Sequence, residues 1–165
     1  NSYKYLKAIL LRPGARFMFY MRGCKKYSKV HPLGFFYRIL YTLLSSRCNV
    51  EIPHTTIIDN GLYFGHFKNI TVNQNTIIGE NCNIMQGVTI GNESRGKRKG
   101  SPIIGNRVVI GPNAVVVGKI TIGDDVLIAP LTLVNFDIPA KAVVLGNPAK
   151  IISDRGSMGY LKNLI

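Results

Sequence analysis

The sequence predicts a mainly β protein: a parallel β-helix with a short α-helical segment before it. Aliphatic or aromatic residues recur every six positions along much of the 165-residue chain, and glycine often follows them. A helix repeats its apolar face every three to four residues, whereas a period of six fits short flat faces joined by tight corners. The aliphatic side chains then stack coil upon coil into one continuous core. The repeated positions are Ile52, Ile58, Phe64, Ile70, Ile78, Ile84, Ile90, Ile104, Ile110, Val116, Ile122, Ile128 and Val134.

Two amphipathic helices are expected before the repeats, over residues 2–22 and 31–47. Residues 1–50 hold ten Lys or Arg and no acid, whereas residues 51–165 hold eleven Lys or Arg and eight acids. We expect the helices to cap the first coil, as solenoids require. A compatible alternative is contact of residues 1–47 with an anionic membrane, because basic amphipathic segments bind anionic headgroups. Nucleic acid is not expected as a partner, because no familiar nucleic-acid-binding motif is present.

Two irregularities interrupt the period of six. The first is a shift of two residues between Ile70 and Ile78, and the second is a step of fourteen residues between Ile90 and Ile104. Insertions in repeat proteins usually form loops on one face, which is often the binding face. The long step therefore predicts a loop insertion over residues 91–103. This loop carries four cations, Arg95, Lys97, Arg98 and Lys99.

The expected domain organisation has three parts. A basic amphipathic helical segment covers residues 1–47, the β-helix covers 48–152, and a tail covers 153–165, where the closing SMGYLKNLI suits a short helix. The three cysteines are odd in number and lack CxxC spacing, which favours reduced thiols over a zinc site or a disulfide framework. We see no signal peptide and no apolar run of about 18 residues. We therefore expect a cytoplasmic protein, with a peripheral position at the inner face of the cell membrane as the alternative.

The run of I-G-x-x-x-x units and the closing DIPAKAVVLGNPAKI resemble the hexapeptide-repeat acyltransferases over about residues 48–152. Within that family, VEIPHTTIIDNGLYFGH and NIMQGVTIG look most like the serine acetyltransferase branch. The resemblance implies a left-handed parallel β-helix, a homotrimer and acetyl-CoA as the acyl donor. It implies no metal.

The same branch pairs an acid with a histidine fifteen residues later, and the matching positions here are Glu51 and His66. The family usually has Asp at the first position, so Glu51 is a longer substitute. A neutral histidine suits removal of a hydroxyl proton during direct attack on a thioester, and a carboxylate can orient its ring. His54 is a second candidate histidine, because the branch has Asp-Ile-His-Pro where this chain has Glu-Ile-Pro-His.

The resemblance also implies a donor site along the last coils. It assigns backbone contacts with the pantetheine arm to Gly111, Ala129 and Asn135, and contact with the CoA phosphates to Lys150. The basic loop is expected to meet CoA phosphates or an anionic acceptor through Arg95, Lys97, Arg98, Lys99 and Ser101.

The acceptor is expected to be a sugar hydroxyl of a polysaccharide or of its lipid-linked precursor, as in the O-acetyltransferases of polysaccharide biosynthesis. Serine acetyltransferases have Asp-Arg-His-Pro in the loop where this chain has Lys99-Gly100-Ser101-Pro102, and they carry a longer helical domain. Serine or another small molecule is the alternative acceptor, and a non-catalytic trimeric membrane-binding scaffold is a further alternative. A zinc enzyme on this fold would need three histidine ligands, whereas the repeats contain only His54 and His66.

Overall fold

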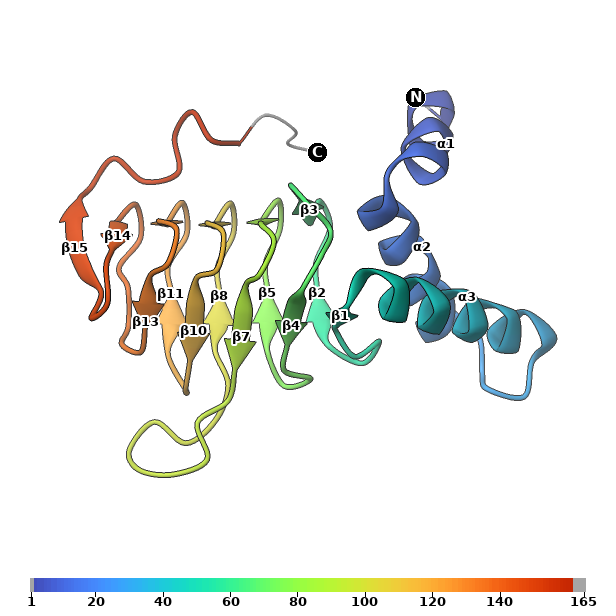
Figure 1. The fold of residues 1–165 in the computed structure, drawn as a ribbon, viewed down its shortest axis with the longest axis horizontal. Helices are drawn as coiled ribbons and strands as arrows, with labels where there is room; N and C mark the ends of the chain where they lie inside the picture. Colours follow the sequence, from blue (N-terminus) through green and yellow to red (C-terminus); the bar gives the residue numbers. More distant parts are fainter. Residues whose placement is uncertain (1, 162–165) are drawn as a thin grey trace.

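The computed structural model describes residues 2–161, which begin with three helices (Figure 1). The helices are α1 (Ser2–Leu11), α2 (Pro13–Lys26) and α3 (Pro32–Cys48). The prediction of one helix over residues 2–22 is wrong, because Arg12 is extended, with φ of −112° and ψ of 116°. A proline disfavours helical geometry in the residue before it, and Pro13 therefore separates α1 from α2. The second expected helix, over residues 31–47, is confirmed by α3.

Short strands follow and form three sheets around one axis, so that each coil contributes strands to successive sheets (Figure 1). The first sheet has the order β1-β4-β7-β10-β13, the second β2-β5-β8-β11, and the third β3-β6-β9-β12-β14-β15. All pairs are parallel except β14 with β15. This architecture confirms the predicted parallel β-helix. The bounds are β1 (Val50–Glu51), β2 (Ile57–Ile58), β3 (Tyr63–Phe64), β4 (Ile70–Val72), β5 (Ile77–Ile78), β6 (Asn83–Ile84), β7 (Thr89–Gly91), β8 (Ile103–Ile104), β9 (Val109–Ile110), β10 (Val115–Val117), β11 (Thr121–Ile122), β12 (Leu127–Ile128), β13 (Leu133–Val134), β14 (Val143–Leu145) and β15 (Lys150–Ser153).

The strand register gives the length of each coil. Thr71 pairs with Thr89, so a regular coil consists of three units of the six-residue repeat, one for each sheet. Phe64 pairs with Ile84, which lies two positions further along the chain than this rule gives. The two extra residues therefore lie between Phe64 and Val72, because Val72 pairs with Ile90 at the regular spacing. The prediction that this shift falls between Ile70 and Ile78 is wrong.

The core is a column of aliphatic side chains inside the three sheets. Ile84, Ile90 and Ile110 are fully buried within it. At the first coil, α2 contributes Phe17, which is also fully buried and whose ring centroid lies 5.0 Å from that of Phe67. The helical segment therefore covers the first coil, as the sequence predicts.

The corners that lead into the first sheet repeatedly use left-handed backbone geometry. Asparagine and glycine adopt this geometry readily, whereas a bulky residue is strained in it. At one of these corners, a Cβ on Gly87 would lie 1.9 Å from Oδ1 of Asn113 in the next coil, so only glycine fits. The residues with positive φ at these corners are Asn49 (51°), Asn69 (55°), Gly87 (71°), Asn113 (57°) and Leu131 (58°).

The C-terminal tail turns back and runs along the β-helix toward the first coils (Figure 1). Residues 156–160 form turns rather than the expected short helix, and residues 162–165 lie outside the described part of the chain. Ser157 fastens the tail, because its backbone N–H donates to Asp125 O at 2.8 Å and its hydroxyl donates to Arg107 O at 2.8 Å. Among residues 2–161, no helix has both the length and the apolarity to cross a bilayer.

Replacing Leu131 with asparagine is expected to raise the free energy of unfolding by about 1 kcal/mol. Asparagine tolerates a φ of 58°, and little packing is lost because Leu131 is 70% exposed. Leu131→Val is the matched control, since a β-branched side chain is more strained at positive φ and should lower stability. Urea unfolding of the two variants and the wild type measures both changes. A free energy for Leu131→Asn at or below the wild-type value would contradict the strain at this corner.

Candidate active site

His66 lies on the corner between β3 and β4, which holds the two extra residues of the first coil. Its side chain is exposed, and its carbonyl accepts a 3.0 Å hydrogen bond from the Lys68 N–H. A cavity of about 440 Å³ opens beside it, and its lining includes Tyr63 and Met85 from the coils and Tyr160 from the tail. The longer corner thus displays the candidate base at the mouth of a cavity.

Asn83 lines the same cavity, and sequence reasoning missed it. It is only 6% exposed, and its Oδ1 has no hydrogen-bond partner among the described residues. A buried amide oxygen without a partner is costly, so it is free to accept a hydrogen bond from a bound ligand. A signal existed in the repeat, because the neighbouring coils have Tyr63 and Val109 in register with this asparagine.

Glu51 lies in β1 and is exposed, and its register partner in the next coil is Thr71. No hydrogen bond or ion pair joins Glu51 to His66 within residues 2–161. Hydrogen bonds between catalytic groups are often long in unliganded enzymes and tighten when substrate binds. The pairing of Glu51 with His66 therefore stays a prediction.

Two donor-site candidates share an edge with His66. Gly111 follows β9 and Ala129 follows β12, at corners that stack over the corner holding His66. The backbone N–H groups of Gly111 and Ala129 each donate at 2.8 Å to the next coil, to Ile128 O and Val144 O. The stack therefore uses these amides, and the Gly111 carbonyl also accepts a 3.3 Å hydrogen bond from the Ala114 N–H. A ligand at these corners would contact remaining carbonyl lone pairs and the closely approaching backbone. We call this column of corners the His66 edge.

Of the other two donor-site candidates, Asn135 lies on a different edge and Lys150 lies at the far end of the His66 edge. Asn135 follows β13 and lines a cavity of about 420 Å³ together with Glu93 and Arg98 of the basic loop. Lys150 is exposed at the start of β15, in register with Leu145, which ends β14 at the same edge as Ala129. A single chain therefore brings three of the four donor-site candidates to one edge and leaves Asn135 on another.

The basic loop joins β7 to β8 and leaves the β-helix at a different edge from His66 (Figure 1). Its base is closed by reciprocal backbone hydrogen bonds of 2.9 Å between Glu93 and Gly100. It is held further by Ser101, whose hydroxyl donates to Asn73 Oδ1 at 2.9 Å, and by Arg98, whose carbonyl accepts from the Lys119 N–H at 2.8 Å. The loop is thus anchored at its base while four cationic side chains remain exposed: Arg95, Lys97, Arg98 and Lys99.

His54 packs against the helical segment. Its ring lies 6.2 Å from that of Tyr41, whose hydroxyl donates to Ile52 O. Burial lowers the pKa of His54, and the positive charges of Arg38, Lys29 and Lys25 lower it further. His54 is not among the described residues that line the cavity at His66. These contacts indicate a structural role for this histidine.

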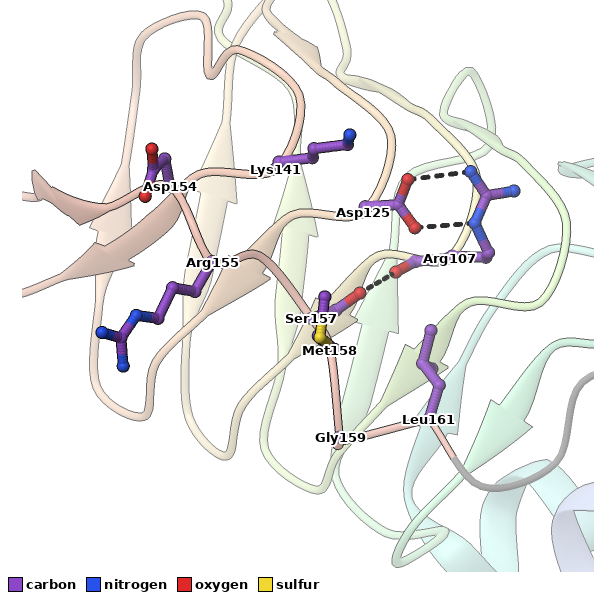
Figure 2. Close-up of a pocket in the computed structure, with 9 residues that line it drawn as sticks. All are labelled: Arg107, Asp125, Lys141, Asp154, Arg155, Ser157, Met158, Gly159 and Leu161. Atoms are coloured by element: carbon purple, nitrogen blue, oxygen red, sulfur yellow. Dashed lines mark hydrogen bonds and ion pairs between the residues drawn. The ribbon is translucent and has the colours of Figure 1, made fainter.

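A larger cavity of about 940 Å³ lies between the tail and the corners that lead into the third sheet (Figure 2). It contains a bidentate ion pair in which Arg107 donates to Asp125 at 2.7 and 2.9 Å. The hydrogen bonds from Arg107 lower the pKa of Asp125. None of the predicted site residues lines this cavity. Two of its lining residues, Arg107 and Ser157, form the hydrogen bond that fastens the tail. Within residues 2–161, no cluster of three His, Cys, Asp or Glu side chains is placed to hold a metal ion.

Comparison with known proteins gives consistent matches. Residues 101–135 match the family model described as bacterial transferase hexapeptide (six repeats). The serine acetyltransferase of Helicobacter pylori is 33% identical over 149 residues, which is 89% of this chain and 85% of that protein. The serine acetyltransferase of Synechococcus elongatus is 33% identical over 119 residues, which is 72% of this chain and 49% of that protein.

A solved structure agrees with these matches. The serine acetyltransferase of Neisseria gonorrhoeae in complex with serine superposes with a TM-score of 0.72 and 28% identity, covering 89% of this chain and 60% of that protein. The chain therefore spans most of one relative and about half to three-fifths of the others described here. These matches support the left-handed sense of the β-helix.

The lowered pKa of His54 makes stability depend on pH. The unfolded chain takes up a proton at His54 near pH 6.5, while the folded protein resists it until lower pH. Stability is therefore fully present above pH 6.5 and is lost as pH falls through the folded pKa. We expect wild type to lose more free energy of unfolding than His54→Gln between about pH 7 and pH 5. Urea unfolding at the two pH values measures this, and equal losses would rule out the assignment.

Proposed function

Because the chain belongs to the serine acetyltransferase family of hexapeptide-repeat acyltransferases, we propose that it transfers the acetyl group of acetyl-CoA to the serine hydroxyl. The observation that carries this proposal is the match to the H. pylori enzyme, which extends over 85% of that enzyme's length at 33% identity. A serine-bound relative with the same fold supports it further.

The expectation of a sugar acceptor is wrong, and so is the non-catalytic scaffold. All the relatives described above are serine acetyltransferases, including one aligned along most of its own length. The length of the helical segment is therefore no argument against serine. The absence of an Arg-His pair before Pro102 remains a real difference in the loop, but it does not identify another acceptor.

The proposed chemistry is direct acyl transfer. His66 takes the serine hydroxyl proton while the oxygen attacks the thioester carbonyl, and a tetrahedral intermediate forms. The intermediate collapses by breaking the C–S bond, and the imidazolium returns its proton to the leaving CoA thiolate. In this proposal Glu51 turns toward the far ring nitrogen of His66 and stabilises the imidazolium. The side chain of Glu51 is one methylene longer than that of Asp.

Acetyl-CoA is proposed to lie along the His66 edge, beside Gly111 and Ala129. The basic loop, with Ser101 and its four cations, lies on another edge together with Asn135. One arrangement unites the two edges, namely a homotrimer in which a neighbour's loop faces His66. In that arrangement Lys150 and the loop cations are available for CoA phosphates or the serine carboxylate. The contact of residues 1–47 with an anionic membrane is a separate proposal that concerns location rather than the reaction.

Release of the CoA thiol from acetyl-CoA tests the acceptor. We expect saturable release with L-serine and only background release with simple sugars or purified polysaccharide repeat units. Mass spectrometry of the product should show O-acetylserine. Turnover on a sugar with serine inert would overturn the proposal, as would hydrolysis of acetyl-CoA that no acceptor stimulates.

Replacing His66 with alanine is expected to reduce turnover by about a hundredfold or more, because a positioned base contributes roughly 10²–10⁴-fold. Glu51→Gln keeps the shape of the side chain but removes its charge, so it should lower turnover about tenfold or more with little change in KM for serine. Lys68→Ala, on the same corner as His66, is the matched control and should keep full activity. Circular dichroism checks the fold of each variant. Full activity in His66→Ala would remove His66 from the mechanism.

A further inference from the structure

The outward face of α3 is apolar and uncovered. Its inner face contains Gly34, which is buried, and Tyr41, which packs on Phe17 with a ring separation of 5.1 Å. On the outer face, Phe35, Ile39 and Leu43 recur every fourth residue and are 63%, 42% and 62% exposed. This spacing places the three side chains in one row along the helix. Phe36, at 54% exposed, widens the row, which we call the α3 stripe.

Other parts of the helical segment also expose large apolar side chains, although, among the described residues, α1 packs on α2 and not on α3. Leu10 and Leu11 at the end of α1 are 64% and 67% exposed, and Val30, just before α3, is 93% exposed. Figure 1 shows α3 at the N-terminal end of the β-helix, with its far end reaching beyond the coils. So many large apolar side chains gathered on one small segment mark an interaction surface rather than ordinary surface variation.

The helical segment that carries the α3 stripe is rich in cations and contains no acid. Residues 1–50 contain ten Lys or Arg and no Asp or Glu, so no acid within the segment neutralises them. Arg38 and Lys25 are used internally, since they donate to backbone carbonyls such as Gly34 O at 3.0 Å and Thr56 O at 2.7 Å. Lys29 and Arg47 are exposed, and the ion pairs within residues 2–161 do not involve them. The segment therefore presents apolar side chains and free positive charge together.

We propose that this segment docks on the surface of an anionic lipid bilayer, with the α3 stripe entering the boundary between headgroups and acyl chains. An amphipathic helix with aromatic and aliphatic side chains beside Lys and Arg has the chemistry for this position. A second copy of the chain fits less well, because it would bring together two cationic segments that contain no acid. The inference goes beyond the proposed reaction and does not depend on which acceptor is acetylated.

Co-sedimentation of the full chain with vesicles tests the proposal. The protein should pellet with vesicles of equal parts phosphatidylglycerol and phosphatidylcholine at low salt, and much less at about 0.5 M NaCl, because salt screens the attraction. Vesicles of phosphatidylcholine alone should bind at least tenfold less protein. Replacing Phe35, Ile39 and Leu43 together with serine should weaken binding to the anionic vesicles about tenfold or more.

Two matched controls distinguish binding through the α3 stripe and the nearby cations from non-specific adsorption to vesicles. Replacing three exposed apolar residues outside the helical segment, Leu145, Ile152 and Met158, with serine should leave binding unchanged. Lys29→Glu with Arg47→Glu should weaken binding at least tenfold, whereas the same change of charge at Lys141 and Arg155 should weaken it far less.

Three results would overturn the proposal. The first is a wild-type protein that does not pellet with anionic vesicles at low salt. The second is equal binding by the serine variant of the α3 stripe and the wild type. The third is a stripe variant whose oligomeric mass falls in analytical ultracentrifugation while vesicle binding persists, which would show that the stripe is a contact between protein copies. Thiol release from acetyl-CoA, measured on the same samples, reports the reaction independently.

Discussion

The stacking of one coil on the next is the constraint on which this structure depends. The strands are two to four residues long, so no strand is stable by itself and each is held by its neighbours above and below. A regular coil must return to the same angular position after three repeat units, as the pairing of Thr71 with Thr89 shows. That return requires tight corners with left-handed backbone geometry, which explains why Asn69, Gly87 and Asn113 lie where they do.

The two departures from the regular coil length position the candidate site. Two extra residues lengthen the corner that displays His66, and the coil from Thr89 to its register partner Val115 is longer still because it contains the basic loop. The two insertions occur at different edges of the three-sided β-helix. The regular coils therefore form the rigid frame, and the two irregular coils carry the candidate site residues His66 and the basic loop.

The period of six is sufficient to predict the fold, because a single α-helix does not repeat its apolar face every six residues, whereas the coils of a β-helix do. It does not place the two-residue shift, since Ile70 and Val72 are both buried and either can continue the series. The break at Pro13 is visible in the sequence, but the apolar pattern continues across it and favours one helix. The burial of Asn83 cannot be predicted, because it depends on the tail and on coils distant in sequence. The sugar acceptor rests on the absence of one pair of residues and on the shorter helical segment, which are weaker evidence than similarity along most of the chain.

The central claim is that one chain carries the base and its neighbour carries the loop that completes the site. It is tested most directly by mixing two inactive variants, His66→Ala and the loop variant Arg98→Ala/Lys99→Ala, under conditions in which subunits exchange. In a trimer with shared sites, an intact His66 then meets an intact loop in about one quarter of the sites. We predict recovery of about a quarter of wild-type thiol release with serine. No recovery after exchange is verified, or full activity in the loop variant alone, would contradict the claim.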